Sequence, residues 1–362
     1  MPHRKRISLP FLAILLVLLT SAASVAAQQA TVLRQRALSR WGIGAGQYSG
    51  IAPLGNNRYA VVSDKEPADG FFIFRILQDG ETGDVTSAAL EGFYGNPTPT
   101  VDASGMSVRD CEGVAYFPKA QTLFISGEGD QQILEYALDG RPTGRRLTVP
   151  TIFSLKNIVP NYGFEALSYD STTHRFWTTT ESTLPADGAA AGSAHPEAQN
   201  ILRLQAFDDE LQPAGQWAYR MDRGHTEKFG KIYVYGVPEV TALPDGRLLV
   251  LEREANVPNG YLGAKVVCKL FLVNPSQGPQ IDAATSLKTL DANHFLIKQL
   301  LATFTTRLTL FRHNFANYEG MCLGQPLADG RQTLLLICDS QGGYGRGPVH
   351  LKDYVRVVIL PR

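Results

Sequence analysis

Glu112-Gly113-Val114-Ala115, followed by Glu128 at the end of the next apolar run, is one of five similar phrases in this sequence. Each phrase has a small or acidic residue, a Gly or small residue, and then an apolar pair, and another acid follows 13 to 20 residues later. The other copies are Ser49-Gly50-Ile51-Ala52 with Asp64, Glu165-Ala166-Leu167-Ser168 with Glu181, Glu239-Val240-Thr241-Ala242 with Glu252, and Glu319-Gly320-Met321-Cys322 with Asp339. A fivefold repeat of this length sets the architecture.

Each repeat is predicted to be an antiparallel hairpin. After Glu112, the apolar run 114–117 and the run 122–126 flank a turn at 118–120, and Pro244-Asp245-Gly246 is a turn signal in the fourth unit. Third strands are expected at 71–77, 132–138, 200–206, 266–273 and 354–360, and fourth strands at 145–149 and 294–304. The pattern predicts an all-β fold, a β-propeller with five or six blades of four antiparallel strands. The N-terminal segment 31–39 and the C-terminal strand are placed to close the ring.

The N-terminus predicts a signal peptide over residues 1–27. Basic residues at 3–6 precede an apolar stretch from Leu9 to Leu19. Val25 and Ala27 occupy the positions that a signal peptidase recognises before its cleavage site. Residues 28–362 then form a single propeller domain, expected in the periplasm or secreted. The apolar stretch is too short to span a bilayer, and we expect no membrane span and a monomer. Without the leader the net charge is −3, because three of the 34 basic residues are removed, which gives no reason to expect a nucleic-acid partner.

Four cysteines, Cys111, Cys268, Cys322 and Cys338, leave two interpretations open. An exported protein can join them in two disulfides. Alternatively, all four are small buried hydrophobic residues.

The acids are the candidate functional residues. A hairpin centred near residue 120 would place Glu112 opposite Glu128, and the same arithmetic pairs Glu165 with Glu181 and Glu239 with Glu252. Around the axis these pairs would form a ring of up to nine carboxylates at one mouth of the channel. The predicted metal ligands are Asp64, Glu112, Glu128, Glu165, Glu181, Glu239, Glu252, Glu319 and Asp339.

Carboxylates so close together need counter-ions. Oxygen-rich sites of this kind suit Ca²⁺, with Mg²⁺ as the alternative. Basic side chains next to the acids are the other remedy, and the candidates are Lys65, Arg109, Arg253 and Arg346. His225, in a loop with other basic residues, is a further candidate for the mouth. A structural interpretation stays open as well, since an acid at the start of an inner strand can bind neighbouring N–H groups and hold the blades together.

The same residues resemble the phytase-like domain family, exported bacterial β-propellers described as having esterase-like activity of phytase. The resemblance rests on Glu112-Gly113-Val114-Ala115, on the stretches 161–167, 238–239 and 249–253, and on 317–321 with 334–339. It runs from about Ser49 to Leu360, and it implies a phosphoric-ester hydrolase that depends on Ca²⁺. Phytases with this fold use carboxylate-bound calcium and basic residues that grip phosphate, and this chain supplies the basic residues only sparsely.

We therefore expect a small-molecule substrate, a phosphate ester, with calcium held by the ring of acids. The expected catalytic residues are Glu165 and Glu239, together with Lys65, Arg109 and Arg253, which would offset charge on the phosphoryl oxygens. Two alternatives stay open. One is a gluconolactonase-like lactone hydrolase, and the other is a non-catalytic binding or scaffold propeller with structural acids.

Overall fold

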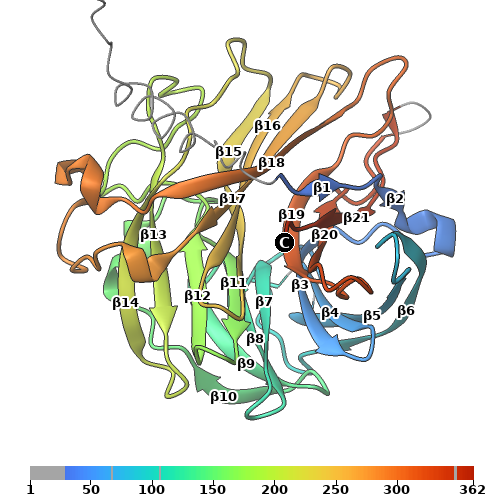
Figure 1. Cartoon of the computed structure of the whole chain (residues 1–362), viewed down its shortest axis with the longest axis horizontal. Coiled ribbons are helices and arrows are strands. Elements are labelled where there is room, and N and C mark those ends of the chain that lie inside the picture. The colour runs from blue at the N-terminus through green and yellow to red at the C-terminus, as the bar shows by residue number, and fades with distance from the viewer. Residues whose placement is uncertain (1–28, 67, 106, 346–348) are drawn as a thin grey trace, which may run out of the picture.

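Five four-stranded antiparallel sheets are arranged around a central axis in the computed structural model (Figure 1). The structure describes residues 29–66, 68–105, 107–345 and 349–362, so the expected signal peptide and Arg346 lie outside the described residues. Blades 1 to 3 comprise β3 (Tyr48–Gly55), β4 (Arg58–Ser63), β5 (Gly70–Gln78) and β6 (Val85–Gly95); β7 (Cys111–Phe117), β8 (Thr122–Gly127), β9 (Gln132–Ala137) and β10 (Pro142–Arg146); and β11 (Phe164–Asp170), β12 (Arg175–Thr180), β13 (Ile201–Phe207) and β14 (Pro213–Arg220).

Blade 4 and blade 5 complete the ring. Blade 4 consists of β15 (Ile232–Ala242), β16 (Leu248–Val257), β17 (Lys265–Val273) and β18 (Lys298–Arg307). Blade 5 consists of β19 (Asn317–Leu323), β20 (Thr333–Asp339) and β21 (Tyr354–Ile359), with β1 (Thr31–Val32) as its outer strand and β2 (Arg36–Ala37) also paired to β21. The propeller therefore has five blades, and the long spacings in the sequence are occupied by loops rather than by a sixth blade.

Helical structure in the described residues is limited to short 3₁₀ turns. These are η1 (Leu38–Trp41), η2 (Thr151–Phe153), η3 (Leu155–Asn157), η4 (Pro275–Gln277), η5 (Leu287–Thr289) and η6 (Ala292–His294). In this described part of the chain, no helix is long and apolar enough to cross a bilayer.

The first and last strands of the described residues meet in one sheet, as expected from the sequence. Thr31 pairs with Ile359 and Val32 with Val358, so an N-terminal strand completes the blade built from the C-terminal strands. The backbone N–H of Leu33 also donates to the carbonyl of Val357 (2.9 Å). This pairing joins the first part of the described chain to the last and closes the ring.

The hydrophobic core is divided into five wedges, and each wedge lies between two neighbouring blades. Blades 1 and 2, 2 and 3, 3 and 4, 4 and 5, and 5 and 1 each share one buried cluster. All four cysteines are free and buried in or beside these clusters, so the interpretation as small hydrophobic residues is confirmed. Sheets buried on both faces explain the continuous apolar runs of the inner strands.

Glycine in the repeated phrase allows the inner strands to approach one another closely. The inner strands are neighbours in the order β3, β7, β11, β15, β19 and back to β3. A Cβ atom on Gly50 would lie 2.3 Å from the carbonyl oxygen of Glu112, and one on Gly113 would lie 2.4 Å from that of Glu165. Backbone contact between blades therefore requires glycine at positions 50 and 113.

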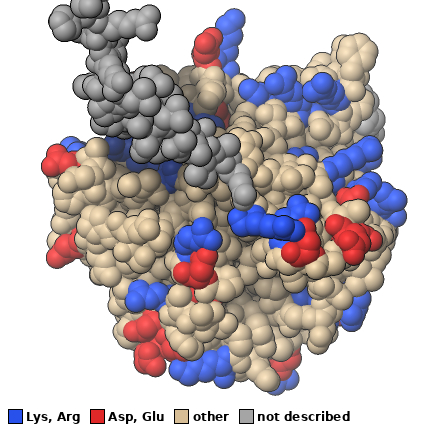
Figure 2. All heavy atoms as spheres, viewed as in Figure 1, with Lys and Arg blue, Asp and Glu red and all other residues tan. Residues whose placement is uncertain are grey.

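Charged side chains are dispersed over one face of the molecule. Figure 2 shows basic and acidic side chains interspersed over the described part of one face, with uncharged surface between them. Most acids of the repeated phrase are buried instead, including Glu112, Glu165 and Glu181, whereas Asp64 and Glu319 are partly buried.

The close approach gives a direct test of the packing. Gly113→Ala should lower the free energy of unfolding by about 1–3 kcal/mol, because backbone of the next blade must move to admit the methyl group. Gly80→Ala is the control, since nothing lies within 4 Å of its added Cβ. Urea denaturation of both variants provides the measurement, and equal stability of the two would contradict this packing.

Candidate metal centre at the channel mouth

Each inner strand carries a bulge near its start, and this bulge changes the register predicted from the sequence. In blade 3, Phe164 pairs with Thr180 and Ala166 with Thr179, so Glu165 is the extra residue. Ser49 and Glu319 are extra residues in the same way, and Glu112 and Gly113 together face a single residue of β8. An extra residue bends the strand and turns its side chain out of the regular alternation.

The predicted direct pairing of the two acids in each blade is therefore wrong. The second acid lies opposite the residue two positions before the first. The N–H of Glu128 donates to the carbonyl of Asp110 (2.9 Å), and that of Glu181 donates to the carbonyl of Gly163 (2.8 Å). Asp339 likewise pairs with Asn317. Both acids of a blade still come to the same end of the sheet, but as diagonal neighbours.

In blade 4, the residues at the mouth are shifted by one position relative to those that the repeated phrase predicts. Gly236 pairs with Arg253 and Glu239 with Leu251, so the residue equivalent to Glu181 is Arg253 and the residue equivalent to Glu165 is Pro238. The predicted pair Glu239 and Glu252 is thus out of phase with the other four. In place of two acids, this blade brings one arginine to the mouth.

Glu239 lies inside the channel wall, at the position where other blades have glycine or alanine. Its Oε1 atom accepts hydrogen bonds from the N–H groups of Leu167 (3.1 Å) and Val240 (2.9 Å), and its carboxyl also accepts from the N–H of Met321. The side chain is 1% exposed. Glu239 therefore ties β11, β15 and β19 together, which is the structural role that the sequence left open.

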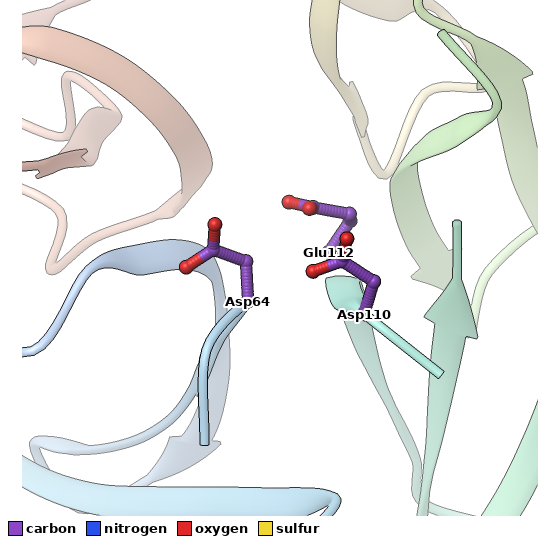
Figure 3. A group of neighbouring side chains, drawn as sticks. All are labelled: Asp64, Asp110 and Glu112. Carbon is purple, nitrogen blue, oxygen red and sulfur yellow. The ribbon is translucent and has the colours of Figure 1, made fainter. Parts of the chain in front are cut away.

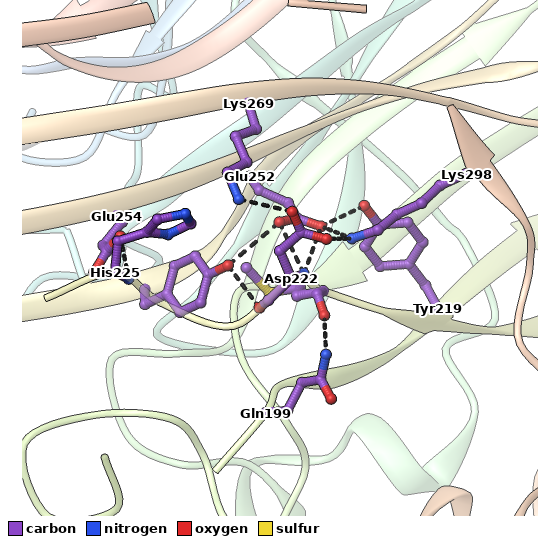
Figure 4. A network of polar contacts seen from close by, with 10 residues as sticks. Gln199, Tyr219, Asp222, His225, Glu252, Glu254, Lys269 and Lys298 are labelled. Atoms are coloured by element: carbon purple, nitrogen blue, oxygen red, sulfur yellow. Dashed lines mark hydrogen bonds and ion pairs between the residues drawn. The ribbon is translucent and has the colours of Figure 1, made fainter. Parts of the chain in front are cut away.

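Glu252 belongs to a separate network between blades 3 and 4 (Figure 4). Its carboxylate contacts the Nζ of Lys298 (2.6 Å) and accepts from the hydroxyl of Tyr219 (2.7 Å) and the N–H of Asp222. Asp222 in turn pairs with Lys269 (2.7 Å). Because successive residues of a strand point to opposite faces, Glu252 and Arg253 cannot both face the mouth.

The remaining acids form a continuous cluster, part of which Figure 3 shows. Carboxylate oxygens of Asp64, Asp110 and Glu112 lie within 4.8 Å of one another, and so do those of Glu112, Glu128 and Glu165. Glu112 is common to both groups and joins them. Asp110 was missed in the sequence because it precedes the repeated phrase, yet the two-residue offset of the second acid brings it to Glu128.

Two carboxylates at the centre of this cluster lack donors. Glu112 is 7% exposed and Glu165 is 9% exposed. Among the described residues, no group donates a hydrogen bond or forms an ion pair to either carboxylate. The buried Oδ1 atom of Asp64 also has no hydrogen-bond partner. Buried, unpartnered anions at this spacing repel one another and need a cation or protons.

Among the described residues, the two cationic side chains of the mouth, Lys65 and Arg253, are already paired. Lys65 contacts Asp64 (2.8 Å) and Asp110 (2.9 Å) at the rim. Arg253 is buried and forms ion pairs with both Glu181 and Glu319, and its Nη1 atom donates to Asn317 (3.1 Å). Asp339 accepts from the side chain and N–H of Gln341. Glu181, Glu319 and Asp339 therefore have partners, unlike Glu112 and Glu165.

The pKa values of the acids reflect this crowding. Burial first, and then the charges of Glu165 and Asp64, raise the pKa of Glu112 well above its usual value. Burial and Glu181 do the same for the pKa of Glu165. Burial and Asp339 raise the pKa of Asp64 to about 7, and burial raises the pKa of Glu128 to about 7 although Gly163 donates to it. Without a cation, the cluster holds protons that ordinary carboxyl groups would release.

Other predicted residues lie elsewhere. Arg109 is buried inside blade 2, where it pairs with Asp130 (2.5 Å) and donates to the carbonyl of Ile125 (2.9 Å). Contrary to the expectation from the sequence, it does not reach the acids of the mouth. The N–H of His225 donates to Glu254 (2.9 Å). Glu254 follows Arg253 in β16 and faces the other side of the hairpin, so His225 is also away from the mouth.

Comparison with known protein families shows which family the chain belongs to. A family model described as "Phytase-like: Esterase-like activity of phytase" matches residues 43–341. The chain belongs to this phytase-like family. The match covers all five inner strands and every acid of the mouth, from Asp64 to Asp339.

Several solved structures resemble this phytase-like propeller at low identity. An endo-arabinase from Bacteroides thetaiotaomicron is 11% identical, with a TM-score of 0.47, and the match covers 90% of this chain and 96% of that one. An α-L-arabinanase from Penicillium chrysogenum, solved with arabinobiose, is 14% identical with a TM-score of 0.42 and coverages of 90% and 98%. At these values the resemblance gives no information about activity or substrate. A comparison with curated proteins gives no match.

The residues of the mouth fit a hard divalent cation. The available donors are carboxylate oxygens, which Ca²⁺ and Mg²⁺ prefer over softer metals. Glu112 and Glu165 are buried without a compensating donor, and Asp64 has one unsatisfied oxygen. Asp64, Asp110, Glu112, Glu128 and Glu165 are therefore the candidate ligands that the geometry brings together.

Glu239 gives a test that separates a structural acid from a ligand. Glu239→Ala leaves three buried N–H groups without an acceptor and should lower the free energy of unfolding by about 2–4 kcal/mol. Glu239→Gln is neutral and keeps an oxygen acceptor, so it should lower the free energy of unfolding much less. Urea denaturation measures both variants. The assignment fails if the glutamine variant is as unstable as the alanine variant.

The raised pKa values of Asp64 and Glu128 predict how the metal-free protein responds to pH. A carboxyl group whose pKa is higher in the folded state stabilises the fold below its unfolded pKa of about 4, and loses that contribution as pH rises through about 7. In a chelator, the melting temperature should therefore fall between pH 5 and pH 8. Calcium should remove most of this fall, because it replaces the protons. A flat profile in chelator would contradict the crowding of these acids.

Proposed function

We propose that this phytase-like propeller is an exported hydrolase of phosphoric esters that depends on a divalent cation, with Ca²⁺ favoured over Mg²⁺. The observation that supports it most strongly is the pair of buried carboxylates of Glu112 and Glu165, which lack donors and share a group of oxygens within 4.8 Å with Glu128. Membership of the phytase-like family supports the reaction class. Export to the periplasm or medium, and action as a monomer, are part of the proposal.

Five residues would hold the cation, namely Asp64, Asp110, Glu112, Glu128 and Glu165. When bound, such an ion polarises a phosphoryl oxygen and lowers the pKa of a water molecule. Of the five other predicted ligands, Glu181, Glu319 and Asp339 serve the same mouth indirectly, since Arg253 and Gln341 bind them. Glu239 and Glu252 have the separate partners described above.

The basic residues divide into one that can meet the substrate and two that cannot. Lys65 stands at the rim with about half of its side chain exposed (46%), so it can approach a phosphoryl oxygen. Arg253 is 4% exposed and bound by two carboxylates, so it positions Glu181 and Glu319 and balances their charge. Although burial alone would lower it, these carboxylates raise the pKa of Arg253 and keep it charged. Arg109, which lies in blade 2, stabilises that blade.

Glu165 is the acid best placed to act on the substrate as well as on the ion. It lies between the cluster and a cavity that is also lined by Glu181 and Glu319. Its carboxylate accepts no hydrogen bond from the described residues, so an ion or a substrate hydroxyl is free to contact it. Glu239, buried and bound by three N–H groups, is assigned to the structure of the ring.

Calcium titration of metal-stripped protein tests the proposal, with hydrolysis of a simple aryl phosphate measured in parallel. Glu112→Gln and Glu165→Gln should each weaken calcium binding by about tenfold or more and reduce hydrolysis. Glu252→Gln is the matched control, because the structure places Glu252 in another network; its calcium affinity should stay near that of wild type.

Other outcomes identify the alternatives. Hydrolysis of lactones without hydrolysis of phosphate esters would replace the proposal by a lactonase. No calcium binding, and no change of melting temperature with calcium, would leave a non-catalytic propeller whose acids are structural. Chelator-resistant hydrolysis of the aryl phosphate would contradict the role of the ion.

A further inference from the structure

A cavity of about 180 Å³ opens beside the acids and has two unlike walls. One wall carries Glu165, Glu181 and Glu319, with Arg253 between the last two. The other wall is apolar and comes from the β15–β16 hairpin and from Tyr261 and Phe315. The proposed reaction uses only the first wall, so the second requires its own explanation.

The apolar wall is built by an extension of blade 4. Strands β15 and β16 continue past the level of Arg253, where Val234 pairs with Ala255 and Ile232 with Val257. Alternate residues of a strand share one face, so these four side chains lie on the same face as Arg253, further along the extension. The other side of this extension carries Glu254, which binds His225. The hairpin is therefore polar on one face and apolar on the face toward the cavity.

Tyr261 completes the apolar side in an unusual backbone conformation. Its φ is +65°, a region that bulky residues rarely adopt. The turn holds it there, since its N–H donates to the carbonyl of Pro258 (3.1 Å) and its carbonyl accepts from Ala264 (2.8 Å). Its ring lies 4.7 Å from that of Tyr344 and 6.3 Å from that of Phe315. Strain of this kind persists where surrounding contacts enforce a side-chain position, and it is frequent at binding sites.

Charge in the cavity opposes a highly charged substrate. Arg253 is the only cationic side chain among the described residues that line it, and two carboxylates already neutralise this arginine. A polyphosphorylated molecule would bring several negative charges against three glutamates. An apolar group, in contrast, gains about 25 cal/mol for each Å² of surface that it buries. Cavities of about 150 Å³ with apolar walls hold one benzene ring.

We propose that the substrates of this site are phosphate esters with a single compact apolar group, such as an aryl group, which occupies the cavity while the phosphate faces the acids. This proposal rests on the proposed function, and it assigns Ile232, Val234 and Val257 to substrate selection. It also assigns to the strained Tyr261 the role of positioning the aryl group. Polyphosphorylated substrates such as inositol hexakisphosphate are disfavoured.

Binding of two phosphonates, which resist hydrolysis, tests the proposal without turnover. Phenylphosphonate and methylphosphonate share the charged group and differ in the apolar one. With calcium present, isothermal titration should show phenylphosphonate binding to wild type about tenfold more tightly. The double variant Ile232→Ser/Val234→Ser should lose most of this preference. Ile297→Ser is the matched control, because Ile297 is 90% exposed and does not line the cavity, and it should keep the preference.

The calcium affinity of each variant, measured in the same experiment, separates the two proposals. Normal calcium binding with equal affinity for both phosphonates, or with no binding of either, would overturn the assignment of the apolar wall alone. Failure of wild type to bind calcium would overturn the proposed function and this inference with it. Loss of calcium binding in the double variant would show that the hairpin supports the acids, and would also count against a role in substrate selection.

Discussion

Close backbone contact between the five inner strands is the constraint on which the rest of this structure depends. The strands pack so tightly that Gly50 and Gly113 have no room for a side chain toward the next blade. Each inner strand has a bulge just before this contact, near the strand's start in every blade except blade 4, and the bulge turns Glu112, Glu165 and Glu319 toward one mouth of the channel. The same packing that makes the ring therefore gathers its carboxylates.

Gathering like charges is costly, and the protein offsets the cost in three ways. Arg253 replaces an acid in blade 4 and neutralises Glu181 and Glu319. Glu239 is taken out of the mouth altogether and bound by backbone N–H groups. Glu112 and Glu165 receive neither kind of partner, so the balance is left to protons or a cation. This unequal distribution divides the mouth into a structural half and a half that is open to a ligand.

Blade 4 gives the mouth its asymmetry. It is the blade whose register is shifted, whose arginine stands in the ring, and whose hairpin continues beyond the acids with an apolar face. A symmetric ring of carboxylates would suit an ion and little else. One exceptional blade places an apolar wall next to the charged one, and the proposed selection of substrate rests on this combination.

The sequence by itself determined the repeat, the propeller, the inner hairpins, the third strands and the closure of the ring, because hydrophobic runs and turn residues are local signals that antiparallel sheets preserve. It left five or six blades open and did not indicate the outer strands β6 and β14. It also located the acids of blades 1, 2, 3 and 5 at one end of the ring, but not those of blade 4. It did not determine their register. Counting residues across a hairpin assumes regular pairing about the assumed centre. The pairing next to the turn is one residue away from that centre, and the bulge adds a second residue, so the second acid is displaced by two positions and Asp110 is brought in.

Only the tertiary structure decided which charged residues meet. The phrase at Glu239 looks like the other four, yet a one-residue shift puts Arg253 in the ring and sends Glu252 to Lys298. Arg109 is adjacent to the acids in sequence but extends into its own blade. Neighbours across blades come from distant parts of the chain, and their contacts depend on how five sheets pack around an axis. No local pattern in the sequence encodes that arrangement.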